Sequence, residues 1–354
     1  MFNCSEEILG YHNDKSSLPQ SERDAMRNRR NSNRDRVYRG LDRNEKPSPS
    51  EFASQGSYSM KTMVQHPEND YDIDDGVYFL GENLKDSYGI EMSSLTARQM
   101  IRDAVDDGSF NTPPVVCENC VRVQYQAGYH VDIPVYRQIF TQNADGYEEF
   151  HFELASTNWV RSDARDVTAW FDGQNQNQSP DTTNGRQMRR MCRLIKKFAI
   201  SRPEWKGQIG SGFMITKLVT ECYLPNANRE DVALYDTMKA IRDRLNDDLI
   251  VHHPVTPNST LTKGNYDPKA IYLRDRLTEA LADLDVLFQP ECTDEEAMKA
   301  WDKVFQTNYF SSQLEDKKER EKRQATANTT LVNDWGKSVE PEHPVEKRGG
   351  GRYA

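Results

Sequence analysis

The chain has 354 residues, of which 29% are charged and 36% hydrophobic, and its formal net charge is -10. This length allows two domains or one large two-lobed domain. We expect no transmembrane helix, because no run of about 20 apolar residues occurs, and no signal peptide, because the first residues lack a basic start and an apolar core. The composition therefore indicates a cytoplasmic protein whose acidic balance is unsuited to coating nucleic acid.

The first half of the chain reads as a mixture of helices and strands. Residues 1–50 are polar, and interleaved acidic and basic residues from Ser21 onward predict a long, solvated helix. Pro and Ser at 47–50 then break the chain. One further helix is predicted at 94–105. The strands are predicted at 77–80, 121–125, 130–136 and 150–155.

The second half reads as mostly helical. Residues 186–199 carry apolar side chains at helical spacing. Thr293 and Glu296 form a capping-box pattern, which predicts a helix start. After Phe310 the apolar pattern stops, and the polar composition from about residue 315 predicts a disordered tail.

Six cysteines are scattered along the chain, and two of them form the single CxxC motif Cys117-Glu118-Asn119-Cys120. A structural zinc site usually needs a second such pair or a nearby pair of histidines. Neither occurs at a useful spacing, so we interpret the cysteines as reduced and structural.

The stretch ENDYDIDDGVYFLGE packs six carboxylates into fifteen positions. An EF-hand starting at Asp70 would need Gly at its sixth position and Glu at its twelfth, where the chain has Asp75 and Gly81. A solvated turn explains Asp70 but accounts less well for Asp72 and Asp74. In an extended segment these two side chains point to the same side, where they can bridge divalent cations.

Two further features complete a candidate site. Asp132 is the sole acid in the strand-like HVDIPVY, where an acid is costly without a partner; taken alone, it reads as an edge residue or a partner of Arg137. Upstream lies the turn Gln55-Gly56-Ser57, in which backbone N–H groups and a hydroxyl can approach a phosphate closely. A Gly-Ser pair by itself carries little information.

In combination, the Gly-Ser turn, the Asp-x-Asp entering a strand and the lone later Asp resemble the polymerase-beta-like nucleotidyltransferases. The strings QGSYSMKTMVQ, YDIDDGVYF and CVRVQYQAGYHVDIPVY resemble those of bacterial cGAS/DncV-like nucleotidyltransferases, the CD-NTases that act in CBASS anti-phage signalling. Strings in the helical half, such as NWVRSDARDVTAWF and GRQMRRMCRLIKKF, fit the same order. The resemblance spans roughly residues 20–310.

The resemblance implies an α+β fold with two lobes, a polymerase-beta-like core and a C-terminal helical lobe, and an active-site cleft between them. It implies that Asp72, Asp74 and Asp132 are catalytic and bind two Mg²⁺ ions, for which Mn²⁺ is a substitute. The residues implied at the donor triphosphate are Gln55, Gly56 and Ser57. The implied division of the chain is a helical segment at 1–50, the catalytic core at 51–160, the helical lobe at 161–312 and a flexible tail at 313–354.

Basic residues recur at three- and four-residue steps within 186–197, opposite the apolar stripe. Most of them read as a solvated face, although such a stripe facing a cleft would attract triphosphates. The resemblance implies that Lys196, or else Lys197, contacts the phosphates together with Ser211.

The implied activity is synthesis of a cyclic di- or trinucleotide second messenger from ATP and a second nucleoside triphosphate such as GTP, with release of pyrophosphate. The product would reach a downstream effector. Without a zinc-ribbon insertion or a basic surface, no activation by double-stranded DNA and no membrane partner are expected. Two alternatives stay open: a non-cyclising RNA or oligoadenylate nucleotidyltransferase, and a non-enzymatic scaffold that binds divalent cations.

The last residues read EKRGGGRYA. This end is either an ordinary frayed terminus or a substrate for a ubiquitin-like conjugation enzyme acting at Ala354, as the resemblance to some bacterial synthases implies.

Overall fold

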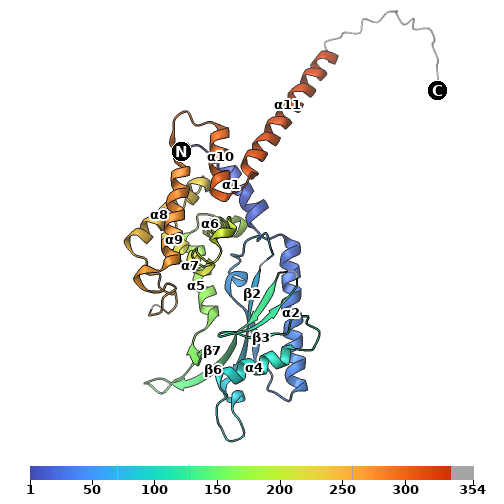
Figure 1. The fold of residues 1–354 in the computed structure, drawn as a ribbon, viewed down its shortest axis with the longest axis vertical. Helices are drawn as coiled ribbons and strands as arrows, with labels where there is room; N and C mark the ends of the chain where they lie inside the picture. Colours follow the sequence, from blue (N-terminus) through green and yellow to red (C-terminus); the bar gives the residue numbers. More distant parts are fainter. Residues whose placement is uncertain (70, 127, 257, 336–354) are drawn as a thin grey trace, which may run out of the picture.

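The computed structural model describes residues 1–335 except 70, 127 and 257, and the predicted conjugation site at Ala354 lies outside the described residues. Figure 1 shows two lobes, a sheet flanked by helices and a bundle of helices, with one long helix projecting from the bundle. This arrangement confirms the predicted α+β class and the helical C-terminal part. Among the described residues, no helix combines the length and apolar character needed to span a membrane.

The first lobe is built on an eight-stranded sheet in the order β3-β4-β5-β2-β6-β7-β8, with β1 also paired to β2. The strands are β1 Glu51–Ser54, β2 Asp72–Leu80, β3 Val115–Val116, β4 Val121–Gln124, β5 His130–Ile133, β6 Val135–Gln142, β7 Glu148–Ala155 and β8 Trp159–Arg161. The predicted strand at 130–136 is divided into β5 and β6 at Pro134, which has no N–H to donate. Both parts pair with β2 in parallel and in one register.

Two helices cover one face of this sheet, α2 Gln20–Arg43 and α4 Ser94–Val105, as Figure 1 shows. Both were predicted, and the side chain of Ser93 caps α4 by accepting from the N–H of Thr96. The helices approach each other closely at Gly40, where a Cβ would meet the backbone of Ala104. The apolar face of α4 buries Ile101 against the sheet residues of the first lobe's core. The two helices therefore share one core with β2 and β5, the strands that carry the three aspartates.

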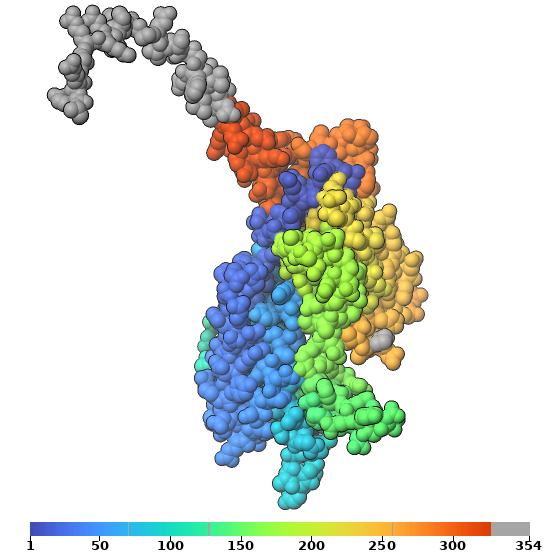
Figure 2. Space-filling view, turned by 180° about the vertical axis from the view of Figure 1, so that it is seen from behind, coloured from blue at the N-terminus to red at the C-terminus, as the bar shows by residue number. Residues whose placement is uncertain are grey.

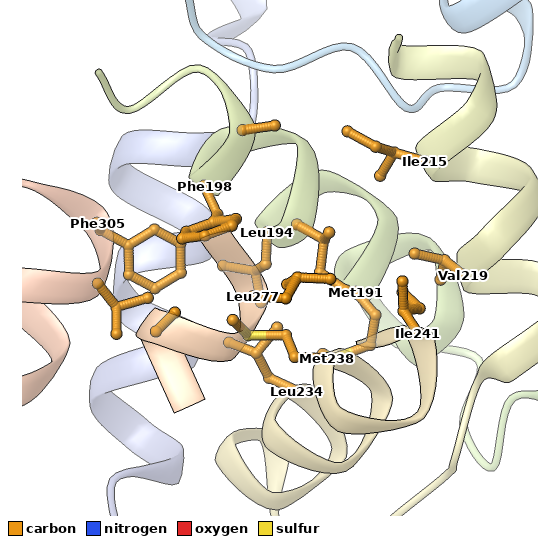
Figure 3. Close-up of a cluster of buried hydrophobic side chains, with 14 of the residues drawn as sticks. Met191, Leu194, Phe198, Ile215, Val219, Leu234, Met238, Ile241, Leu277 and Phe305 are labelled. Atoms are coloured by element: carbon orange, nitrogen blue, oxygen red, sulfur yellow. The ribbon is translucent and has the colours of Figure 1, made fainter. Parts of the chain in front are cut away.

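The second lobe is an all-helical bundle with its own core, part of which is shown in Figure 3. Its helices are α1 Ser5–Tyr11, α5 Ala164–Gln178, α6 Gln187–Ala199, α7 Gly212–Cys222, α8 Glu230–Asp247, α9 Pro268–Asp283 and α10 Asp294–Phe305. The apolar stripe of α6 lies at the centre of the cluster, with Met191, Leu194 and Phe198 facing the other helices. The predicted capping box of Thr293 and Glu296 is confirmed at the start of α10.

Helix α1 belongs to this bundle although α2 lies on the sheet. Tyr11 of α1 is buried and stacks on Phe310. The connection between α1 and α2 therefore crosses from one lobe to the other, which Figure 1 shows as the blue segment between bundle and sheet.

The expectation of a disordered tail from about residue 315 is wrong up to Trp335, because α11 spans Tyr309–Trp335. Ion pairs rather than an apolar face support its exposed part: Arg323 pairs with Glu319 one turn away, and Lys318 reaches Glu295 of α10. Such pairs stabilise helices only weakly, and apolar periodicity does not reveal them.

Candidate active site

The sheet brings the three predicted aspartates together. Asp72 and Asp74 lie on β2, and Asp132 lies on the neighbouring parallel strand β5 directly opposite Asp74. Alternation along a strand places side chains two residues apart on one face, so Asp72 and Asp74 lie side by side. The three aspartate side chains therefore converge on one site because β2 and β5 pair in this register.

The Gly-Ser turn packs directly against this cluster. Gln55 donates its backbone N–H to the carbonyl oxygen of Asp74 at 2.8 Å. Gly56 has a φ of +60°, and a Cβ added to it would lie 2.1 Å from Oδ2 of Asp74. Both the left-handed backbone and the close carboxylate exclude a side chain at this position. Ser57 follows at the start of the short helix α3 Gly56–Ser59.

The carboxylates are close enough to alter one another's ionisation. Burial, together with the charges of Asp72 and Asp132, raises the pKa of Asp74 to about 7. Asp72 lies 3.3 Å from Nε2 of His130, and this contact raises the pKa of the imidazole. The site thus holds more negative charge than its own groups neutralise.

Asp132 has a counter-ion within the same sheet. Arg122 of β4 lies opposite it and donates to both carboxylate oxygens, at 2.8 Å from Nε and 2.6 Å from Nη2. The thiol of Cys120 also lies against Asp132, and burial with the nearby carboxylate raises the pKa of that thiol. Asp132 is therefore buried but paired, as an acid in an apolar strand requires.

The donor set fits a divalent cation. Asp72, His130 and Asp132 each offer a ligand atom, and these atoms lie within 4.8 Å of one another. Asp74, whose pKa is raised by burial and by the neighbouring carboxylates, lies beside them. Carboxylate oxygens are the donors that Mg²⁺ and Mn²⁺ prefer, and a bound cation would restore Asp74 to its ionised form.

A cavity of about 620 Å³ opens in front of Asp72 and Asp74 and is lined by both lobes. From the first lobe it receives Gly56, Ser57 and the two aspartates of β2, and from the second lobe Lys196 of α6. This volume is in the range of small-molecule sites. The cavity is therefore large enough for a nucleotide beside the carboxylates.

The structure places the predicted phosphate contacts unequally. Lys196 lines the cavity and donates to Oγ1 of Thr62 at 2.9 Å. Lys197 points elsewhere and donates to the carbonyl oxygen of Gln65. Ser211 caps α7, accepting from the N–H of Met214, between two cavity-lining glycines. The side chain of Gln55 is buried and exchanges hydrogen bonds with Tyr78 and Tyr136, so only its backbone faces the turn.

Sequence reasoning missed His130 and Arg122 as members of this site. Strand alternation gives a signal for His130, since it lies two residues before Asp132 and thus on the same face. Arg122 lies on a different strand, and its pairing depends on the β4–β5 register. The cysteines, in contrast, are free thiols as predicted.

Comparisons with known proteins agree with this geometry. Residues 50–136 match the family model described as the nucleotidyltransferase domain of cyclic GMP-AMP synthase DncV-like proteins. The fold is similar to Vibrio cholerae DncV cyclic AMP-GMP synthase in complex with nonhydrolyzable GTP, with a TM-score of 0.66 at 16% identity over 86% of this chain and 96% of that one.

Two further solved structures are similar over most of their lengths. Escherichia coli DncV in its 3'-deoxy GTP bound form gives a TM-score of 0.62 at 16% identity, covering 82% of this chain and 92% of that one. The Bradyrhizobium diazoefficiens CD-NTase CdnG in complex with GTP gives 0.63 at 12% identity, covering 87% and 98%.

The sheet with its acidic strands and the adjoining helical lobe form a fold of the polymerase-beta-like nucleotidyltransferase type. The segment 50–136, which matches the DncV-like nucleotidyltransferase domain, contains all three aspartates and the Gly-Ser turn.

Proposed function

We propose that this protein joins nucleoside triphosphates and closes them into a cyclic di- or trinucleotide, releasing pyrophosphate. The observation that supports this most directly is the packing of Gly56 against Asp74 at the mouth of a cavity that also holds Lys196. A triphosphate lying on the turn would thereby reach the carboxylate cluster and a lysine of the opposite lobe.

The chain's own groups can bind and orient the donor. The turn at Gly56 leaves room for phosphate oxygens close to the backbone, and Ser57 adds a hydroxyl. Lys196 is held by Thr62 so that its ammonium group lies in the cavity wall. Burial lowers the pKa of Lys196 to about 8, and an arriving phosphate would stabilise its charged form.

We propose that Asp72, Asp74 and Asp132 hold divalent cations, with His130 as a neighbour that orients Asp72. Cations bound there would neutralise the triphosphate and lower the pKa of the attacking hydroxyl. Arg122 keeps Asp132 pointing along the sheet face through two hydrogen bonds. Preorganised charge of this kind, rather than a dedicated acid or base, carries most of the catalysis in phosphoryl transfer.

A cyclic product is favoured over a linear one by the relatives. One similar structure is Vibrio cholerae DncV in complex with the linear intermediate 5' pppA(3',5')pG, a compound on the way to a ring. For this chain we propose ATP with a second nucleotide as substrates, and a role of the product in anti-phage signalling through an effector.

The test is to incubate the full chain with the four radiolabelled nucleoside triphosphates and Mg²⁺, treat with phosphatase, and separate the products. A cyclic product resists phosphatase, whereas the linear product of a non-cyclising transferase does not. We expect a resistant product from the wild type and none from the Asp72→Ala/Asp74→Ala variant, with the fold retained by circular dichroism.

The matched control is Glu68→Ala, which removes an exposed acid from the same stretch and should keep full synthesis. Synthesis by the double variant would refute the site. Metal binding without turnover in the wild type would instead favour the scaffold alternative.

A further inference from the structure

A second cavity, of about 670 Å³, lies where the α1–α2 connection meets α6. Its walls come from three places: the connection itself, the loop after α3, and the start of α6. Figure 2 shows the blue N-terminal segment running from the bundle along the first lobe beside the green start of the second lobe. An adjoining cavity of about 470 Å³ shares several of the same residues.

The lining of this second cavity is strongly cationic. It includes Arg23, Lys61, Arg189 and Arg193 against the single carboxylate of Asp14. Asp14 is itself engaged, since it accepts a hydrogen bond from the hydroxyl of Tyr309 at 2.7 Å. An excess of positive charge is unexpected in a chain of net charge -10 and points to an anionic ligand.

Three of these cations, Arg23, Lys61 and Arg193, have no acidic partner within the described part of the chain. Arg23 donates only to the side-chain amide oxygen of Gln20. Arg193 donates to the carbonyl oxygen of Lys61 at 2.9 Å and faces His12, both of which are neutral partners. Arg189 differs, because it pairs with Asp172.

The burial of Arg193 and the positive charges around it disfavour its charged form. Burial and the charges of Arg189 and Arg23 lower the pKa of the Arg193 guanidinium to about 10. A charge held in a half-buried site next to like charges is stabilised by any anion that enters.

This cavity is separated from the active site by a shared wall. In the segment 60–65, Met60 and Thr62 line the active-site cavity, whereas Lys61 and Gln65 line the second one. Helix α6 divides in the same way, with Lys196 on the active-site side and Arg193 on the other. An anion in one cavity therefore does not occupy the other.

We propose that the second cavity binds a small polyanion carrying two or more neighbouring phosphate or carboxylate groups. Guanidinium groups match such oxygens with paired hydrogen bonds. Arg23 and Lys61, which are exposed at the rim, would meet the ligand first, and Arg193 would contact its inner end. The ligand would thus contact Arg193, which donates a hydrogen bond to the carbonyl oxygen of Lys61. Lys61 lies five positions after Gly56 of the active-site turn.

The test uses tripolyphosphate and citrate as probes, measured by isothermal titration calorimetry at constant ionic strength in EDTA. The Lys196→Met background weakens triphosphate binding in the active site without requiring enzyme activity. We expect one remaining site for at least one probe. Adding Arg23→Gln/Lys61→Gln should weaken that site about tenfold or more, because two charge-assisted contacts are lost.

The matched control is Arg39→Gln/Lys299→Gln, which removes two exposed charges elsewhere and should leave the affinity unchanged. Binding of tripolyphosphate alone identifies phosphate chemistry, and binding of citrate alone identifies carboxylate chemistry. Equal weakening by both double variants, or no binding of either probe in the Lys196→Met background, would overturn the proposal.

Should Lys196→Met fail to fold, hydrogen exchange on the wild type decides the same question. Citrate or tripolyphosphate should slow exchange in residues 13–23 and 184–193. Protection confined to residues around 56 and 211 would place the probes in the active site and contradict the second site.

Discussion

Two clusters of like charge lie on opposite sides of the wall that α6 and the segment 60–65 form, and they differ in their hydrogen-bond partners. On the sheet, burial together with the charges of Asp72 and Asp132 raises the pKa of Asp74 to about 7. On α6, Arg189 and Arg193 instead donate to backbone carbonyl groups of the segment 60–65. The acids therefore need a cation, whereas Arg193 is bound by a neutral carbonyl group and keeps its charge for an anion in the second cavity.

The basic face of α6 also holds the segment 60–65 in place. Arg189 donates to the carbonyl of Met60, Arg193 to that of Lys61, and Lys196 to that of Thr62. These bonds fasten the chain that leaves the Gly-Ser turn to the second lobe. Only Lys196 combines this role with a place in the active-site cavity.

The largest expected effect on the acidic site comes from the substitution Gly56→Ala. The new Cβ would lie 2.1 Å from Oδ2 of Asp74, and the φ of +60° disfavours any side chain. We expect turnover to fall about a hundredfold, since small displacements of a positioning group have effects of this size. The free energy of unfolding should fall by about 1–2 kcal/mol from the backbone strain alone.

Gly173→Ala is the control, because nothing lies within 4 Å of a Cβ at this helical position. It should leave turnover unchanged and stabilise α5 slightly. Steady-state synthesis and urea denaturation measure both variants. Full activity of Gly56→Ala would show that the turn does not need to approach Asp74.

Strand alternation is a local rule, and it placed Asp72 and Asp74 on one face of a strand. The family resemblance, rather than any local rule, implied that Asp132 joins them, and the parallel pairing of β2 with β5 brings the three together. The residues that pair with these aspartates could not be predicted in the same way. Arg122 reaches Asp132 only through the β4–β5 pairing, which joins residues that no periodic pattern connects.

The sequence predicted that α6 carries many basic residues, but it did not predict which of them reaches the active-site cavity. Spacing placed Lys196 and Lys197 on one helix, yet the two side chains diverge, one toward the cavity and one toward the carbonyl of Gln65. Which of them faces the site depends on how the two lobes dock. The sequence of a single helix does not reveal how the two lobes dock.

The pH dependence of nucleotide binding sharpens the role of Lys196. Burial lowers its pKa to about 8, and a bound triphosphate raises it, so binding takes up a proton above pH 8. Affinity for a nonhydrolysable nucleotide should therefore fall about tenfold between pH 7 and pH 9. Lys196→Arg, which stays charged, should flatten this dependence in calorimetric titrations. A wild-type affinity that is constant over this range would remove Lys196 from the phosphate site.

The smallest expected effect concerns His12, which lies beneath the braced face of α6. Its imidazole is buried, faces Nη1 of Arg193 at 3.3 Å, and has its pKa lowered to about 3, first by burial and also by the charge of Arg193. The unfolded chain binds the proton near pH 6.5 and the folded chain does not, so stability is full above that pH and is lost as the pH falls. Between pH 6.5 and 5.5 this group should cost about 1 kcal/mol of unfolding free energy.

Urea denaturation of the wild type and of His12→Gln at the two pH values measures this cost. The variant should lose about 1 kcal/mol less than the wild type over the interval, because glutamine does not titrate. If both proteins lose the same stability, the imidazole is protonated in the folded state. It would then add a fifth positive charge to the region of Arg23, Lys61, Arg189 and Arg193. Arg193 would no longer face a neutral imidazole while it donates to the carbonyl oxygen of Lys61.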